Sequence, residues 1–264
     1  MDGTMTNCGT LQSKCRPFLA GAQVQTYWEM SPGNYYTHEC TITHLNVTAT
    51  GDTVMLTASH CTKWPFDLDD SKWVQSQFFN GDTVPRFAEW VDPPTFTGGQ
   101  CPSNKFCRWS DASLAKLETG PTNGNLLYWG VMRTRGFPSL CCTIDVDQTT
   151  NYPWITVVGF QTVFSGQSVR KIGRTTGHTW GYVNATCQNR EWSSNVNMLC
   201  QITAGMALDG GDSGSPLFTY STSSGVGSFV GVIHSRYRDW QNKEHGVVSP
   251  FSNVKAEIPQ FPYP

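Results

Sequence analysis

The stretch GGDSGSPLF, residues 210–218, fixes one hydroxyl between an acidic residue and a glycine. Glycines lie on both sides of Asp212 and Ser213, and Pro216 begins an apolar run. A serine hydroxyl is a poor nucleophile at neutral pH, so a catalytic serine needs a base within hydrogen-bonding reach and a group that orients this base. The stretch therefore makes Ser213 a candidate nucleophile and directs the search to a histidine and a carboxylate.

Two further stretches offer this histidine and this carboxylate. In VMLTASHCT, residues 54–62, a strand-like run ends in small residues, with His60 at its mouth and a cysteine beside it. In CRWSDASLAKLE, residues 107–118, small and apolar residues follow Asp111, which predicts a partly buried acid. A buried unpaired carboxylate is costly, and an imidazole N–H would satisfy it. A single histidine is more often a solvated or core imidazole, so the three stretches carry weight only together.

Short runs rich in β-branched and aromatic residues recur along the chain between Gly, Pro, Asn and Asp. They are CTITHLNVT (40–48), TVMLTASH (53–60), KWVQSQFF (72–79), NYPWITVVGF (151–160), HTWGYVNAT (178–186), VNMLCQIT (196–203), SPLFTY (215–220) and SFVGVIHS (228–235). This is an all-β pattern of the sandwich or barrel type. Only SDASLAKLE (110–118) and the tail SNVKAEI (252–258) suggest helical turns. The polar stretch DVDQTTNY (145–152) predicts a linker between two β-rich halves.

Taken together, the three chemistry-bearing stretches resemble the chymotrypsin-like (trypsin-fold) serine endopeptidases. TASHC is similar to that family's T-A-x-H-C around the catalytic histidine, and SDASLAKL to its D-x-A-L segment around the catalytic aspartate. GGDSGSP is similar to the family's G-D-S-G-[GS]-P around the nucleophile. The resemblance thus assigns His60, Asp111 and Ser213 as a triad, in the family's own order. It is strongest to the secreted bacterial and fungal streptogrisin-like and glutamyl endopeptidase branches.

The resemblance also implies a fold and a reaction. The fold would be two packed six-stranded antiparallel β-barrels with few short helices. Residues 1–150 would hold an N-terminal extension and the first barrel, with the histidine and the aspartate, and residues 151–264 the second barrel, with the serine and the specificity pocket. The amides of Gly211 and Ser213 would form the oxyanion hole. The implied reaction is hydrolysis of peptide bonds through an acyl-enzyme, with no metal and no organic cofactor.

Asp212 would face inward in this family and would need a cationic partner. In animal trypsin-like enzymes this partner is a freed N-terminus from an I-V-G-G cleavage site, a motif that the chain lacks. The segment SVRKIGRTTGHTWG, residues 168–181, is similar to the R-x-G-x-T-T-G region of the streptogrisin-like branch, where an internal arginine pairs with the aspartate. Lys171 and Arg174 are the candidates here, with Arg170 behind them. A solvated basic turn is the alternative.

The substrate preference is less well defined by the resemblance. Ala207 stands where trypsin-like enzymes carry an acidic pocket floor, so a strong preference for Lys or Arg is not expected. On the opposite wall, FVGVIHSRY places His234 where serine is common, followed by Ser235 and Arg236. In glutamyl endopeptidases of this fold a histidine at or beside that position receives the substrate carboxylate, so His234 with Arg236 would favour acidic residues before the scissile bond. The alternatives are a wall histidine hydrogen-bonded to the Asp111 region, and a preference for small or apolar residues.

The ten cysteines are even in number and lack the paired CxxC spacing of a zinc site, which favours disulfides. Disulfides imply an oxidising compartment, so the protein is expected to be secreted. Two N-x-S/T sequons, at Asn46 and Asn184, are compatible with glycosylation.

The pairing of the cysteines follows from their positions and from the resemblance. Cys40 and Cys61 match the family's His-loop bridge, Cys101 and Cys107 would close a small local loop, and Cys187 and Cys200 would link neighbouring strands. Because a bridge between adjacent cysteines is strained, Cys141 and Cys142 are expected to have partners elsewhere. These partners would be Cys8 and Cys15, in either pairing, which would tie the N-terminal segment to the start of the linker.

Charge and hydropathy narrow the partners. Charged residues make up 14% of the chain and the formal net charge is −2, so no field favours nucleic acid or an anionic membrane. No stretch reaches the roughly 18 apolar residues of a membrane span, and the N-terminus lacks the apolar core of a signal peptide, so a mature or trimmed monomer is expected. A catalytically inactive protease-like binding protein is one alternative, against which the three intact motifs argue. An esterase or a viral-type processing enzyme is the other, and the abundant cysteines argue against the cytosolic viral type.

Overall fold

The computed structural model of the chain describes residues 8–13, 15, 17–75, 86–119, 126–149 and 153–262. One sheet comprises β2 (Gln23–Ser31), β3 (Asn34–Thr41), β4 (His44–Val47), β5 (Thr53–Thr57), β6 (Lys72–Val74), β7 (Arg86–Val91) and β9 (Ser113–Thr119). The other comprises β1 (Phe18–Ala20), β8 (Phe106–Arg108), β10 (Leu126–Met132), β11 (Trp154–Phe160), β12 (Ser168–Gly173), β13 (Gly177–Glu191), β14 (Val196–Gly205), β15 (Pro216–Tyr220), β16 (Val226–Arg238) and β17 (Glu244–Pro250). A short 3₁₀ helix, η1 (Ser59–Cys61), follows β5, and helix α1 (Phe251–Glu257) follows β17.

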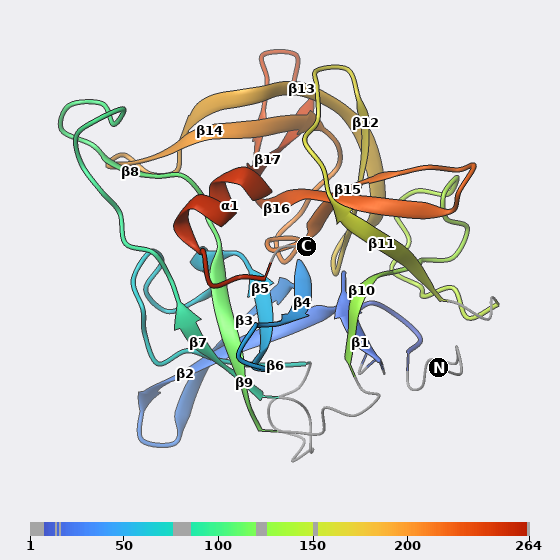
Figure 1. The fold of residues 1–264 in the computed structure, drawn as a ribbon, viewed down its shortest axis with the longest axis horizontal. Coiled ribbons are helices and arrows are strands. Elements are labelled where there is room, and N and C mark those ends of the chain that lie inside the picture. The colour runs from blue at the N-terminus through green and yellow to red at the C-terminus, as the bar shows by residue number, and fades with distance from the viewer. Residues whose placement is uncertain are drawn as a thin grey trace.

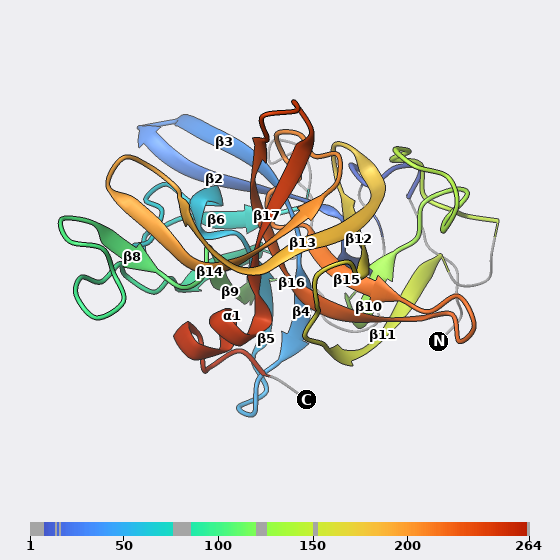
Figure 2. The same cartoon turned by 90° about the horizontal axis from the view of Figure 1, so that it is seen from above.

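The strand pairing makes the second sheet close on itself. Its strands run in the order β1-β10-β11-β16-β15-β12-β13-β14-β17, and β16 also pairs with β17. The six strands from β16 to β17 therefore form an antiparallel ring. The first sheet runs β3-β2-β6-β7-β9-β5-β4, also antiparallel, with seven strands where six were expected. In Figure 1 the strands of the ring lie above most of the first sheet, with α1 beside β16 and β17, and Figure 2 gives the view from above.

The all-β prediction is confirmed, and each of the quoted runs contributes to a strand. Of KWVQSQFF, residues 72–74 form β6, and residues 76–79 lie outside the described part. The tail SNVKAEI is helical, as α1, but SDASLAKLE is not helical, so that prediction is wrong. β9 forms there instead, because it pairs with β5 on one edge and β7 on the other. Ser113, Leu114 and Ala115 are all fully buried, and this two-sided burial overrides helix propensity.

The last strand of the first sheet is β9, and every strand from β10 onward belongs to the second sheet, which also takes β1 and β8 from the earlier part of the chain. The division into domains at residues 150 and 151 stays a prediction. In the expected linker, Asp145 forms a bridge with Thr10, and Val146 forms one with Thr134. Residues 150–152 lie outside the described part.

Five disulfides occur, and two of them correct the expected pairing. Cys40–Cys61, Cys101–Cys107 and Cys187–Cys200 are paired as predicted. Cys8 instead pairs with Cys15, and Cys141 with Cys142.

The N-terminal pair forms because its segment folds back on itself. The N–H of Ser13 donates to Thr10 O at 3.0 Å, and the Cα atoms of Cys8 and Cys15 lie only 4.4 Å apart. The N-terminal segment still docks on the start of the linker, through backbone bonds such as Leu11 N–H to Ile144 O. No bridge to the adjacent cysteines is needed for that contact.

The core that joins the two sheets contains a buried histidine. The His44 ring lies 4.7–5.9 Å, centre to centre, from the rings of Trp129, Phe160, Phe229 and Phe261. Neither of its nitrogens has a hydrogen-bond partner in the described residues. Burial lowers the pKa of His44 to about 3, so the ring is neutral and packs as an apolar group.

Both sequon asparagines use their side-chain amides within the fold. Asn46 donates to Pro262 O at 2.9 Å, and Asn184 Nδ2 lies 2.7 Å from His245 Nδ1. Glycosylation at either site stays a prediction. Among the described residues, no helix has the length and apolar character to cross a bilayer.

Candidate active site

His60, Asp111 and Ser213 form one hydrogen-bonded chain of side chains. His60 Nδ1 lies 2.8 Å from Asp111 Oδ2, and His60 Nε2 lies 2.8 Å from Ser213 Oγ. The backbone N–H of His60 also donates to Asp111 Oδ1, at 3.0 Å. The fold therefore brings together the three residues that the motifs single out, although 153 positions separate His60 from Ser213.

Different elements deliver the three side chains. The histidine is the middle residue of η1, directly after β5, the aspartate lies between β8 and β9, and the serine lies in the turn before β15. This turn is bonded to both sheets. Thr41 N–H at the end of β3 donates to Ser213 O at 2.8 Å, and Gly214 N–H donates to Ile233 O on β16 at 2.7 Å. The site thus lies at the junction of the two sheets.

Burial and the His60–Asp111 contact determine the ionisation of these side chains. Burial alone would raise the pKa of Asp111, but His60, through its charge and hydrogen bonds, holds that pKa well below its usual range. Burial lowers the pKa of His60, and the Asp111 charge outweighs this, so the His60 pKa lies above its ordinary value. Asp111 is fully buried, whereas the His60 side chain is 17% exposed. The arrangement therefore gives an ionised carboxylate beside an accessible and strengthened base.

The turn before the serine directs two backbone N–H groups away from protein acceptors. Gly210 O accepts a threonine hydroxyl at 2.6 Å, and Asp212 O accepts a backbone N–H at 2.9 Å. Because the C=O and N–H of a trans peptide point in opposite directions, the N–H groups of Gly211 and Ser213 point the other way. In the part of the chain that the structure describes, neither donates to a protein acceptor.

Two glycines of GGDSGSPLF are required by this turn. Gly211 has φ +91° and Gly214 has φ +82°, a region that favours glycine. A Cβ at Gly214 would lie 2.1 Å from Thr41 O and 2.3 Å from Thr57 Oγ1. A larger residue would therefore push the nucleophile turn away from the first sheet.

Lys171 is the cation beside Asp212. Its Nζ lies 3.2 Å from Asp212 Oδ2, and both side chains are buried. Asp212 also accepts the N–H groups of Thr175 at 2.9 Å and Thr176 at 3.2 Å. Burial opposes the charge of Asp212, but Lys171 and these bonds lower its pKa below the usual value. Of the other candidates, Arg174 donates its Nε–H to Gln23 Oε1 at 2.7 Å.

A cavity of about 190 Å³ opens beside the serine. It is lined by Leu208, Asp209, Gly210, Asp212, Ser213, Ile233, His234, Ser235 and Arg236. The Arg236 guanidinium is paired with two carboxylates: Nη1 lies 3.0 Å from Glu244 Oε1, and Nη2 lies 3.0 Å from Asp209 Oδ1. Nη1 also donates to Leu208 O at 2.5 Å. The one arginine of the lining is therefore already shared between two carboxylates.

Of the other three pocket candidates, Ser235 lines the cavity, and His234 and Ala207 have different surroundings. His234 is 1% exposed in its side chain, with Nε2 3.0 Å from Gln201 Oε1 and Nδ1 3.7 Å from Asp111 Oδ2. His234 Nδ1 therefore faces Asp111 without a hydrogen bond, and Nε2 is directed at Gln201. Ala207 is absent from the lining of the cavity, and its carbonyl accepts the Thr179 hydroxyl at 3.0 Å.

Several residues that support the site carry no sequence motif. Arg108 is fully buried, and its Nη1 lies 2.6 Å from Asp92 Oδ1 and 3.1 Å from Ser59 Oγ, next to His60. Its Nη2 donates to Ala112 O at 2.6 Å, next to the aspartate of the triad. An arginine inside the apolar run FCRW is the one signal in the sequence that could have pointed to it.

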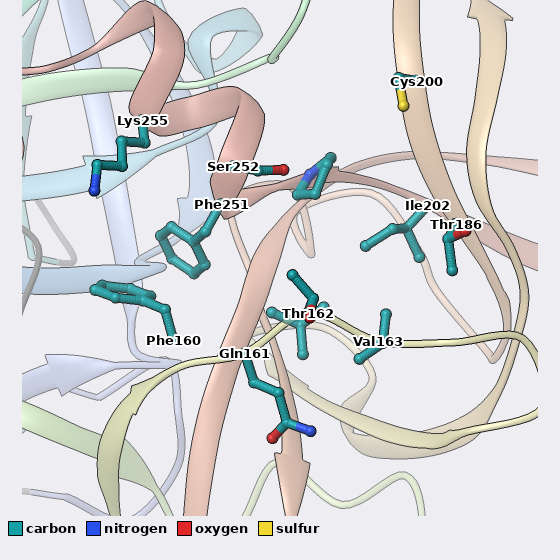
Figure 3. Close-up of a pocket in the computed structure, with 12 residues that line it drawn as sticks. Phe160, Gln161, Thr162, Val163, Thr186, Cys200, Ile202, Phe251, Ser252 and Lys255 are labelled. Atoms are coloured by element: carbon teal, nitrogen blue, oxygen red, sulfur yellow. The ribbon is translucent and has the colours of Figure 1, made fainter.

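Another cavity, larger than the one beside Ser213, has no triad residue in its lining, and Figure 3 shows the side chains around it. Its volume is about 460 Å³, and it is lined by Phe160, Gln161, Thr162, Val163, Thr186, Cys200, Ile202, Val230, Pro250, Phe251, Ser252 and Lys255. In Figure 3 the rings of Phe160 and Phe251 lie on one side, and Ile202 and Thr186 on the other.

The described residues contain no group of His, Cys, Asp and Glu that could hold a metal ion.

No family model matches the chain, and no curated protein matches it in sequence. Solved structures do match. Protease A of Thermobifida fusca has a TM-score of 0.57 and 17% identity over 91% of this chain and 95% of its own. A Nocardiopsis protease has a TM-score of 0.57 and 16% identity over 90% and 94%. A glutamic acid specific serine protease that uses a histidine triad in substrate binding has a TM-score of 0.55 and 18% identity over 90% and 96%. At this level of identity the likeness shows the fold: the chain has the chymotrypsin-like fold of these serine proteases.

Proposed function

We propose that the protein is a secreted serine endopeptidase that hydrolyses peptide bonds with Ser213 as nucleophile, His60 as base and Asp111 as the group that orients the base. The observation that carries the proposal is the continuous chain of two 2.8 Å contacts from carboxylate to imidazole to hydroxyl. A shared fold does not by itself imply a shared activity, so the geometry is the argument.

The reaction follows from these contacts. His60 Nε2 accepts the proton of Ser213 Oγ as this oxygen attacks the peptide carbonyl carbon, which gives a tetrahedral species. Asp111 holds the Nδ1–H tautomer and stabilises the imidazolium. The imidazolium then donates its proton to the leaving amine, and the C–N bond breaks. Water, deprotonated by the same imidazole, hydrolyses the resulting ester.

The two free amides fit the charge that develops in this reaction. Among the described residues, the N–H groups of Gly211 and Ser213 donate to no protein acceptor. This supports their assignment as an oxyanion hole. Removal of one such donor lowers the rate by roughly 10²–10³-fold in comparable enzymes. The Lys171–Asp212 ion pair stabilises the same turn.

The substrate preference that the cavity supports best is a small uncharged residue before the scissile bond. At about 190 Å³ the cavity is smaller than a typical ligand site of about 300–1,000 Å³. Arg236, its one cation, is shared between Asp209 and Glu244, so an acidic side chain would have to displace one of these carboxylates. The acidic preference is the second candidate, because Arg236 does line the cavity.

Secretion is supported by the disulfides, because such bonds persist in oxidising compartments. The expected partner is a protein or peptide substrate, cleaved by a monomer.

Incubation with a peptide library and mass spectrometry of the products tests both parts of the proposal. Cleavage at internal bonds, abolished in Ser213→Ala, is expected, with Ala, Ser, Thr or Val enriched before the cut. Enrichment of Glu or Asp would establish the second candidate instead. Absence of cleavage together with absence of fluorophosphonate labelling would favour the inactive binding protein.

A further inference from the structure

A second imidazole lies next to the Asp111 carboxylate. His234 Nδ1 is 3.7 Å from Asp111 Oδ2, the same oxygen that lies 2.8 Å from His60 Nδ1. The His234 side chain is almost completely buried. Two imidazoles therefore flank one carboxylate oxygen, and the reaction as proposed uses only one of them.

Gln201 decides which nitrogen of His234 carries the proton. Gln201 Nε2 donates to Trp109 O at 2.8 Å and to Leu199 O at 2.6 Å, so Gln201 Oε1 is on the other side and can only accept. His234 Nε2 lies 3.0 Å from this oxygen and must donate to it. A neutral imidazole that is protonated at Nε2 has a bare Nδ1.

The contacts of Ser249 agree with this orientation of the Gln201 amide. The N–H of Asp111 donates to Ser249 Oγ at 2.9 Å, and Ser249 Oγ–H donates to Gln201 Oε1 at 2.9 Å. Turning the Gln201 amide over would bring its oxygen against two carbonyl oxygens. The network therefore has one consistent arrangement of hydrogen atoms.

The bare nitrogen of His234 faces the carboxylate without a bond. Among the described residues, His234 Nδ1 has no hydrogen-bond partner. Burial, opposed by the Asp111 charge, lowers the pKa of His234 to about 4, so the ring is neutral at pH 7. A lone pair, rather than an N–H group, is thus directed at the charge of Asp111.

We propose that His234 is a positioning residue of the triad: held by Gln201 as the Nε2–H tautomer, it presents an acceptor to Asp111 and leaves the carboxylate charge to His60. A hydrogen-bond donor in the same place would stabilise the carboxylate and weaken its attraction for the His60 proton. His234 therefore keeps His60 a stronger base. This inference deepens the proposed function and rests on the triad assignment.

Other ionisable groups also act on the pair. His38 on β3 interacts electrostatically with His60, and Asp92, which follows β7 and is paired with Arg108, interacts with Asp111. A test must therefore change His234 while leaving these groups in place.

Two substitutions separate the acceptor from the rest of the ring. His234→Asn places an amide N–H where the bare nitrogen lies, and the carboxylate selects the donor. His234→Gln keeps a donor for Gln201 Oε1 and removes the nitrogen that faces Asp111. His38→Gln is the matched control, because it removes a neighbouring imidazole that is not part of the Gln201 network.

Nitrogen-15 NMR of the full chain reads the result without turnover. In the unsubstituted protein, His234 is expected to be protonated at Nε2 and bare at Nδ1. His234→Asn is expected to lower the His60 pKa by about half a unit to one unit and His234→Gln by less, whereas His38→Gln removes a like-charged neighbour and is expected not to lower it. A His234 protonated at Nδ1, or a His60 pKa that is unchanged or raised in His234→Asn, would overturn the inference.

Fluorophosphonate labelling and the pH–rate profile distinguish a wrong role for His234 from a wrong assignment of the protein as a peptidase. If the protein does not react with a fluorophosphonate, the peptidase proposal fails, whatever the NMR result. If it reacts, the acid limb of its pH–rate profile is expected to move to lower pH in His234→Asn. A role in packing alone would lower the rate and leave that limb in place.

Discussion

Two buried ion pairs support the candidate site, one next to Ser213 and one next to His60 and Asp111. They differ in the number of chain segments that they join. Among the described residues, Lys171 forms an ion pair with Asp212, which immediately precedes Ser213. Arg108 instead links three separate segments: Nη1 contacts Asp92 after β7, Nη2 contacts Ala112 before β9, and Nε lies 3.5 Å from a carboxylate oxygen of α1. The first pair fixes a turn, and the second fixes the assembly around the base.

A buried ion pair can therefore either fix the position of one turn or hold separate segments of the chain together. The Asp212 carboxylate holds the backbone from which the two free amides project, so loss of the Lys171–Asp212 pair should slow the reaction in addition to lowering stability. His60 and Asp111 are joined by two contacts of their own, which do not involve Arg108. Loss of Arg108 should therefore act mainly on stability.

Lys171→Met is expected to have the largest effect, because it leaves Asp212 buried without its cation. Breaking a buried pair in this way costs about 3–5 kcal/mol, and displacement of the two amides should slow fluorophosphonate labelling by about 10²-fold or more. Urea unfolding and labelling kinetics measure the two effects. The control is Arg174→Met, since Arg174 binds Gln23 and not Asp212. Equal losses in the two variants would contradict the assignment of Lys171.

Arg108→Met should destabilise the fold by a similar amount, about 3–5 kcal/mol, but slow labelling of the folded fraction by less than about tenfold. The reason is that the His60–Asp111 contact survives when the surrounding segments loosen. Labelling at low temperature, corrected for the folded fraction from urea curves, provides the measurement. A labelling loss as large as that of Lys171→Met would remove the distinction between the two pairs.

His44 extends the comparison to a buried base with no charged partner. Its pKa is about 3 in the folded chain, against about 6.5 when unfolded, so the unfolded state binds the extra proton first. The fold therefore loses stability as pH falls from about 6.5 towards 3, by about 3 kcal/mol at pH 4.5. His44→Leu should lose that much less stability between pH 7 and 4.5 in urea titrations. Identical pH slopes for the two chains would mean that the ring is not buried in neutral form.

Glu257 on α1 ties the helix to the segment before Asp111. Its carboxylate accepts the N–H groups of Trp109 at 2.7 Å and Ser110 at 2.8 Å. Glu257→Gln is expected to lower the free energy of unfolding by about 1–2 kcal/mol, because charged acceptors bond more strongly. Glu191→Gln, which breaks an exposed pair with Lys105, serves as the matched control and should cost less than about 1 kcal/mol. If the control loses as much as Glu257→Gln, the tie to α1 contributes nothing specific.

The sequence predicted the parts of the molecule that local chemistry determines. The all-β class followed from runs such as TVMLTASH, and the triad candidates followed from three short motifs that the fold brings together. Lys171 was among the predicted partners of Asp212, because its segment resembles a known one. In each case neighbouring residues along the chain carry the information.

Long-range packing determines what the sequence could not reveal. The segment SDASLAKLE is extended because β5 and β7, which are distant in the sequence, enclose it. The role of Arg108 depends on three segments that meet only in the folded chain. The same holds for His234, whose surroundings come from Gln201 on β14 and from the triad aspartate.

The most direct test of the account is fluorophosphonate labelling followed by mass spectrometry of the modified peptide. One adduct is expected, on Ser213, with labelling lost in Ser213→Ala and slowed by several orders of magnitude in His60→Ala. An adduct on another residue, or equal labelling of the folded His60→Ala variant, would contradict the claim that these side chains act as one nucleophilic unit.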